Sequence, residues 1–281
     1  MAKILVALDE DTMFAKDLIA TSRALCSQWK KNLYVGLVVK DLSYNTRISS
    51  FVERSVMADI NPYLEDDLLT EEDHQKAELL CNFIHNVRPS GLNYEIYNDF
   101  KMSTHEVIKQ TTYADLLILS YQIFQQKSNR FDNVLLYQVL KESKCPVLII
   151  PKGIRDINNI IFAYDGKESS VFAIKSFSSL FADAVKDKPV SILTVTPSLE
   201  EEIKNEKFLL ELAKHYYNNV GVQLLEGSNI SAEIKSFADT VENPLVVMGA
   251  YGRSSISNLL IPSVARGIIE DKRLPLFIAH R

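Results

Sequence analysis

Short apolar runs alternate along the chain with stretches whose apolar residues have helical spacing. Continuous apolar runs bounded by polar residues are typical of strands buried on both faces. In the first half they predict strands at Lys3–Asp9, Leu33–Val39, Leu92–Tyr97, Ala114–Ser120 and Cys145–Pro151. Helices are predicted at Thr12–Trp29, Ser103–Thr112 and Val134–Lys141. Strands alternating with helices indicate an α/β fold with a mainly parallel sheet.

The same series then starts again. Asn159–Asp165 matches the opening strand, Pro189–Val195 the second, Leu245–Gly249 the fourth and Leu274–Ala279 the last. From the fourth strand onward the register holds without a gap, so that Pro275 aligns with Pro146. A repeated order of elements is the signature of a duplicated unit. The sequence therefore predicts two domains in tandem, 1–152 and 153–281, arranged as a pseudo-dimer.

The first half is longer, and its surplus lies between the second and third strands, within Asp41–Arg88. We interpret the surplus as an insertion of one or two helices. Over Thr70–Val87 the apolar residues Ala77, Leu80, Cys81 and Ile84 have helical spacing, so one face should pack on the domain. The acidic residues from Glu65 to Asp73 are interpreted as a solvated helix face rather than a metal site.

The last strand of each half is apolar and ends its domain, as edge strands do. Exposed apolar edges tend to pair with another strand. We therefore expect Cys145–Pro151 and Leu274–His280 to pair antiparallel inside the chain and to join the two halves.

The composition and charge of the chain argue against several classes of function. Apolar residues make up 47% and charged residues 24% of 281 residues, which is ordinary for a globular protein. The net charge of −5 argues against nucleic acid as the main partner. No apolar stretch reaches the roughly 18–20 residues that span a bilayer, and the N-terminus lacks a signal-peptide layout. The three cysteines, Cys26, Cys81 and Cys145, lack metal-site spacing and are interpreted as buried thiols. A cytoplasmic location is expected.

The stretch after the fourth strand of the second half carries the candidate chemistry. Gly249 and Gly252 lie in a loop that leads to a helix starting near Ser263, an arrangement that offers backbone N–H groups to an anion. Asp165 and Val195 end neighbouring strands, and ligands of such sheets bind at the carboxyl ends of strands. An acid, an apolar wall and N–H donors together suit a nucleotide.

Each of these residues also has a structural interpretation. Asp165 to Glu168 fits a capping box at a helix start. The two glycines can serve a turn, and Ser263 can act only as a helix cap.

At this point the sequence resembles a known family. Val247–Ser254 and Pro262–Ala265 look like the phosphate-binding stretch of universal stress proteins, and the resemblance covers the whole chain as a tandem pair. It implies Rossmann-like domains of the adenine nucleotide alpha hydrolase type, each with a five-stranded sheet, and binding of ATP or AMP, with or without Mg²⁺. Carried over, the resemblance assigns nucleotide contacts to Ala163, Asp165, Val195, Met248, Gly249, Gly252, Arg253, Ser263 and Val264.

The family pattern Gly-x2-Gly-x9-Gly-Ser/Thr is broken once here, because Pro262 replaces the third glycine. Proline is nevertheless favoured at the first position of a helix, so the following N–H groups can still face an anion. In the first half, Ser120, Ile123, Asn133 and Val134 stand at the loop positions, and no phosphate site is expected there. Asp9 is then interpreted as a cap.

Catalysis finds little support in the sequence. It has no Gly-x4-Gly-Lys-Ser/Thr motif, and the five histidines are scattered. The Ser-Gly-Gly-x-Asp-Ser loop of ATP pyrophosphatases is also missing after the first strand. We therefore expect a stress-response protein that acts by binding adenine nucleotide, with at most slow hydrolysis. The alternative is a nucleotide-free scaffold that engages a protein partner. A homodimer is compatible with either.

Overall fold

The computed structural model describes residues 3–8, 18, 20–22, 33–37, 81, 94–97, 104–121, 134–154, 156–249 and 263–279. We call the described residues up to 154 the N-terminal half and those from 156 the C-terminal half. The strands of the N-terminal half are β1 (Ile4–Leu8), β2 (Leu33–Leu37), β3 (Tyr94–Tyr97), β4 (Leu116–Ser120) and β5 (Val147–Ile150). Those of the C-terminal half are β6 (Asn159–Ala163), β7 (Val190–Thr196), β8 (Val220–Glu226), β9 (Pro244–Gly249) and β10 (Leu276–Ala279).

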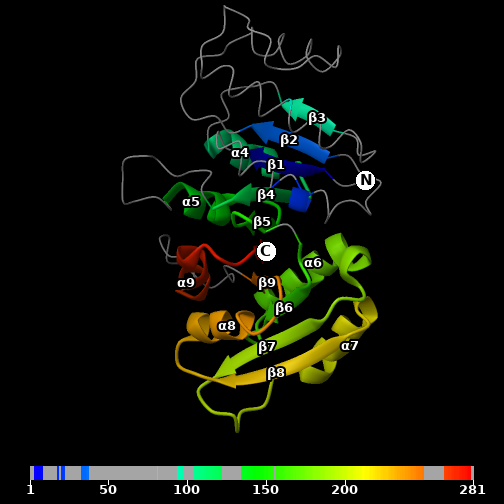
Figure 1. The fold of residues 1–281 in the computed structure, drawn as a ribbon, viewed down its shortest axis with the longest axis vertical. Coiled ribbons are helices and arrows are strands. Elements are labelled where there is room, and N and C mark those ends of the chain that lie inside the picture. Colours follow the sequence, from blue (N-terminus) through cyan, green and yellow to red (C-terminus); the bar gives the residue numbers. More distant parts are fainter. Residues whose placement is uncertain are drawn as a thin grey trace, which may run out of the picture.

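All ten strands form one sheet, in the order β3-β2-β1-β4-β5-β10-β9-β6-β7-β8 (Figure 1). Within each half the pairs are parallel, and the strand order of the second half mirrors that of the first. The expected α/β fold is confirmed, with five parallel strands in each half, and the two sets are joined into one sheet. The third strand of the second half, β8, was not among the strands predicted from the apolar runs.

The two halves join through β5 and β10, which pair antiparallel in the register Leu276–Ile149, Phe277–Leu148 and Ile278–Val147. The predicted pairing of the two final strands is therefore confirmed. The apolar edge that each half would otherwise expose is covered by the other half.

The helices are α4 (Thr104–Thr111), α5 (Val134–Glu142), α6 (Glu168–Val185), α7 (Glu206–Tyr216), α8 (Ile230–Ala238) and α9 (Ser263–Asp271). Buried residues of α6 and α7 belong to the core on one face of the sheet, together with Phe162 and Phe277. Buried residues of α4, α5, α8 and α9 belong to the core on the other face. Each core contains strand residues of both halves, so burial links the halves on both faces.

The helices predicted at Ser103–Thr112 and Val134–Lys141 are confirmed as α4 and α5. Most of the insertion lies outside the described residues. Its Cys81 is helical and half-buried, and it packs against the core on the α6 face, as expected for the inner face of that helix. Among the residues described here, no helix is long and apolar enough to cross a membrane. We keep 1–152 and 153–281 as a proposal for the two domains.

Candidate functional site

The carboxyl ends of β6, β7 and β9 lie side by side in the C-terminal half. Ala163 is the register partner of Met248 on one side and of Leu193 on the other. Val195 lies two residues beyond Leu193, and strand side chains alternate, so Val195 and Leu193 share a face. The sheet therefore brings together three of the residues predicted to contact the nucleotide, Ala163, Val195 and Met248.

This apolar patch lies on the face covered by α8 and α9. Ala163 and Val195 are half-buried against that core, whereas Met248 is buried within it. Val264, in the first turn of α9, packs against the same core and is also half-buried. An apolar surface that stays partly accessible at the ends of parallel strands suits the flat face of a base.

Asp165 follows β6 at the same edge and is directed by local contacts. Its carboxylate accepts a hydrogen bond from the Lys167 backbone N–H at 3.1 Å and pairs with the Lys167 ammonium at 3.1 Å. Partial burial raises the pKa of Asp165, but the contacts from Lys167 and Ser170 outweigh it and leave the pKa below its usual value. Asp165 is therefore ionised at neutral pH and half-exposed.

The capping-box interpretation of Asp165 is wrong. Helix α6 begins at Glu168, its N-cap residue is Lys167, and no side chain caps it. Asp165 instead forms an Asx turn with Gly166 and Lys167, in which Gly166 has a φ of 76°. The turn fixes the carboxylate just after the carboxyl end of β6.

Packing inside the protein accounts for the presence of glycine at position 249. A Cβ at this position would lie 2.4 Å from the backbone carbonyl carbon and oxygen of Ser169 and 2.7 Å from the Ser170 nitrogen. The absent side chain therefore makes room for the first turn of α6, and Gly249 by itself gives no evidence of a ligand.

The rest of the predicted phosphate loop lies outside the described residues. This applies to Gly252, Arg253 and Pro262, and to the side chain of Ser263. The backbone of Ser263 is described and begins α9, so the predicted helix start is confirmed.

The equivalent strand end of the N-terminal half is built differently. Ser120, which aligns with Gly249, is buried, and its hydroxyl has no hydrogen-bond partner in the described part of the chain. The next residue, Tyr121, is buried and donates a hydrogen bond of 2.7 Å to the Leu274 carbonyl in the C-terminal half. Burial raises the pKa of Tyr121, so the phenol stays protonated. This strand end serves the junction between halves.

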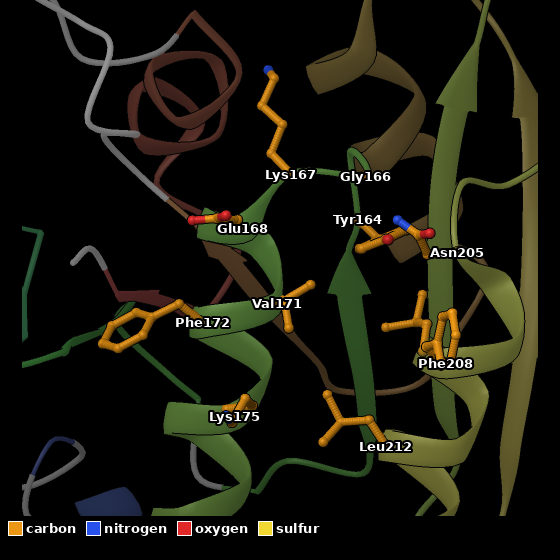
Figure 2. Close-up of a pocket in the computed structure, with 11 residues that line it drawn as sticks. Tyr164, Gly166, Lys167, Glu168, Val171, Phe172, Lys175, Asn205, Phe208 and Leu212 are labelled. Atoms are coloured by element: carbon orange, nitrogen blue, oxygen red, sulfur yellow. The ribbon is translucent and has the colours of Figure 1, made fainter.

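A groove that the sequence did not predict runs between α6 and α7, on the opposite face of the sheet from the apolar patch. Its volume is about 460 Å³. Figure 2 shows Val171, Phe208 and Leu212 directed toward the space between the two helices, with Tyr164 and Asn205 at one end. An apolar stripe on a helix shows that the helix packs on the sheet, but it does not show whether part of the stripe borders a groove.

Other reactive groups in the described residues have structural surroundings. No group of three or more histidine, cysteine, aspartate or glutamate residues that could hold a metal is found there. Burial raises the pKa of the Cys145 thiol to about 12, which leaves it protonated and unreactive at neutral pH. Tyr217 shares a buried hydrogen bond of 2.8 Å with Ser178, and burial raises its pKa.

Comparison with known proteins gives one sequence match and several structural ones. The chain is 28% identical over 146 residues to the universal stress protein Slr1230 of Synechocystis, a match that covers 50% of this chain. The chain spans about half the length of that relative, 48%. No protein-family model matches.

Two solved structures share the fold over nearly the whole chain. A universal stress protein from Archaeoglobus fulgidus aligns with a TM-score of 0.67 and 15% identity, covering 99% of this chain and 98% of that one. A putative universal stress protein from Pseudomonas aeruginosa aligns with a TM-score of 0.63 and 12% identity, covering 100% and 93%. The fold match includes the tandem arrangement, and the sequence match names the same family. The chain therefore has the fold of these universal stress proteins over nearly its whole length, and half of it is similar in sequence to a universal stress protein.

Proposed function

We propose that the C-terminal half binds one adenine nucleotide, ATP or AMP, and that the protein acts in a stress response through this binding rather than through turnover. The observation that carries the proposal is the half-buried apolar patch of Ala163 and Val195 beside Met248, at the carboxyl ends of parallel strands. An ionised carboxylate, Asp165, follows Ala163 by two residues at the end of β6, and α9 begins at Ser263.

The parts of a nucleotide match this arrangement in order. The adenine ring would lie against the patch, because contact between two apolar faces removes apolar area from water. Asp165 would accept hydrogen bonds from the ribose hydroxyls. Its present ion pair with Lys167 is largely exposed, with side chains 48% and 76% accessible, and such pairs contribute only about 0–1 kcal/mol. Exchanging that contact for a ribose contact therefore costs little.

The phosphates would lie at the N-terminus of α9, where the first N–H groups of the helix are free of helical partners. We assign this role to the backbone of Gly252, Arg253, Ser263 and Val264 and to the hydroxyl of Ser263, following the family pattern. Met248 and Gly249 would border the base and ribose. Mg²⁺ would then be held by phosphate oxygens and water rather than by a cluster of protein carboxylates.

The test has two steps. The purified protein is first denatured, and the supernatant is examined by absorbance and mass spectrometry for copurified adenine nucleotide. Nucleotide-stripped protein is then titrated calorimetrically with ATP and with AMP, each with Mg²⁺ and with chelator. We expect one site per chain and no steady release of phosphate above a slow background. Absence of binding at millimolar nucleotide would reject the proposal.

A second candidate is a nucleotide-free scaffold that engages a protein partner. It is favoured by Gly249, whose missing side chain is accounted for by α6, and by Pro262, which lacks an N–H and adds a ring near the phosphate path. If the parent protein binds no nucleotide but Pro262→Gly does, the proline has closed the site and the scaffold function is the better proposal.

A further inference from the structure

The groove between α6 and α7 is separate from the proposed nucleotide site. Its walls come from the α6 face of the sheet, whereas Ala163, Val195 and Met248 belong to the core on the other face. The two sites share only the turn after β6, since Gly166 and Lys167 border the groove and Asp165 does not. A volume of about 460 Å³ lies in the range of small-molecule sites.

The walls of the groove are mainly apolar. Leu209 forms part of the floor and is 3% exposed, while Val171 and Leu212 are half-buried. Phe208, in the first turn of α7, is 69% exposed, among the most exposed large apolar side chains of the described residues. Figure 2 shows its ring on the side of α7 that faces α6. An apolar body placed here would remove area from water on both walls.

The turn after β6 closes one end of the groove, and the positively charged Lys175 on α6 borders it. The Tyr164 hydroxyl donates a hydrogen bond of 2.8 Å to the Lys204 carbonyl, and Gly166 lies against the Lys204 side chain, so the turn after β6 seals this end. Lys175 borders the groove from α6 and is exposed, with no ion pair among the described residues. The acid in the lining, Glu168, is directed away from α7 in Figure 2. The charge available to an occupant is therefore cationic.

We propose that the α6–α7 groove binds a small amphipathic anion, a molecule with an apolar aliphatic or aromatic body and one anionic head group. The body lies against Val171, Phe208 and Leu212, and the head group lies near Lys175. The closed end limits the length of the body, which favours a small molecule over a peptide running through the groove.

The experiment uses the full chain and the fluorescent probe 1-anilinonaphthalene-8-sulfonate, an apolar aromatic sulfonate, with displacement by decanoate, decanol and decyltrimethylammonium. We expect probe binding at one site per chain and displacement by decanoate at lower concentration than by decanol, with the cation weakest. Phe208→Ser should weaken probe binding about 5- to 10-fold through lost apolar contact. Lys175→Glu should weaken it about 3- to 10-fold through reversed charge.

Matched controls separate the groove from other exposed apolar positions. Ile230→Ser changes an apolar residue that is 41% exposed on α8, and Lys214→Glu reverses an exposed charge on α7 outside the groove lining. Both should leave probe affinity within about twofold, and both groove variants change exposed side chains, so folding should be retained. Equal losses in the controls, unchanged affinity in both groove variants, or decanol displacing as well as decanoate would overturn the proposal. Calorimetric titration with ATP is run in parallel, and neither groove variant should alter it.

Discussion

The two halves of the chain share a strand order but use the carboxyl end of the fourth strand differently. In the C-terminal half, β9 ends in Gly249, and the α6 backbone packs where a side chain would otherwise lie. In the N-terminal half, β4 ends in the buried Ser120, followed by Tyr121, which bonds across to Leu274. The sequence places Ala250 opposite Tyr121, so no symmetric bond is possible from the other half. The strand end of the N-terminal half therefore serves the junction between the halves, whereas the proposed nucleotide site lies at that of the C-terminal half.

The contact surface between the halves shows the same divergence. In the ungapped register, Leu148 is equivalent to Phe277, and these two residues are register partners of each other on the pseudo-twofold axis. Tyr137 on α5 and Arg266 on α9 are likewise equivalent, and the guanidinium lies 5.9 Å from the ring centroid, where α5 and α9 meet (Figure 1). A symmetric dimer would face each residue with its own copy. Fusion into one chain permits unlike pairs on the axis.

The largest expected effect comes from breaking the packing at Gly249. Gly249→Ala would place a Cβ against backbone atoms of Ser169, which cannot rotate away, so the start of α6 must shift. We expect a loss of about 3 kcal/mol in the free energy of unfolding, measured by urea denaturation followed by circular dichroism. Ser120→Ala is the matched control and should change stability by less than about 0.5 kcal/mol, since it removes a buried hydroxyl without a described partner. Similar losses in both variants would show that the two strand ends are not different.

Nucleotide affinity should follow only the C-terminal copy. Ser263→Ala would remove the hydrogen bond to a charged phosphate that we propose, worth about 1.5–3 kcal/mol, so ATP affinity should fall roughly 10- to 150-fold. The matched change in the other copy, Val134→Ala, should have little effect on affinity. Calorimetric titration of stripped protein measures both.

The carboxylates extend this comparison of the two copies. Asp165→Ala should weaken nucleotide binding, whereas Asp9→Ala should not, and Pro262→Gly should leave affinity unchanged or increase it. Two equivalent sites per chain would contradict the proposal of a single site. Sensitivity to Asp9→Ala without sensitivity to Asp165→Ala would show that the nucleotide binds in the N-terminal half instead.

The junction formed by Tyr121 can be tested by removing one oxygen atom. Tyr121→Phe leaves the buried Leu274 carbonyl without this donor and should cost about 1–2 kcal/mol of unfolding free energy. Tyr113→Phe is the control, because Tyr113 is 69% exposed and its change should be neutral. If thermal and urea unfolding of Tyr121→Phe match those of the parent, the hydrogen bond does not stabilise the junction.

The smallest effect concerns the unlike pair on the axis. Tyr137→Arg would place two guanidinium groups together and should cost about 1 kcal/mol, and Arg266→Tyr should lose the cation–π contact at a similar cost. The double exchange, Tyr137→Arg with Arg266→Tyr, restores the pair in mirrored order. We expect it to recover most of the loss in urea denaturation. Additive losses in the exchanged protein would mean that the two positions are not equivalent about the axis.

Much of the fold could be predicted because the strands of each half are continuous apolar runs separated by polar segments. The apolar runs gave the strands, and the ungapped alignment of Pro146 with Pro275 gave the duplication and the pairing of the two final strands. Of the candidate site, the sequence indicated the strand ends that carry Ala163, Asp165 and Val195. It did not indicate that the Asp165 carboxylate is held by Lys167 rather than capping α6, because a capping box and an Asx turn use the same residue types.

What the sequence determined by itself is which faces are buried and where strands end, since periodicity and breaker residues encode these locally. The tertiary structure decided which distant segments meet: Ser169 against Gly249, Tyr121 against Leu274, and Val171 across a groove from Phe208. An apolar stripe specifies that a helix packs on the sheet, but not how far it lies from its neighbour. That distance depends on side chains from both helices and on the order of the strands beneath them, and it is what leaves the α6–α7 groove open.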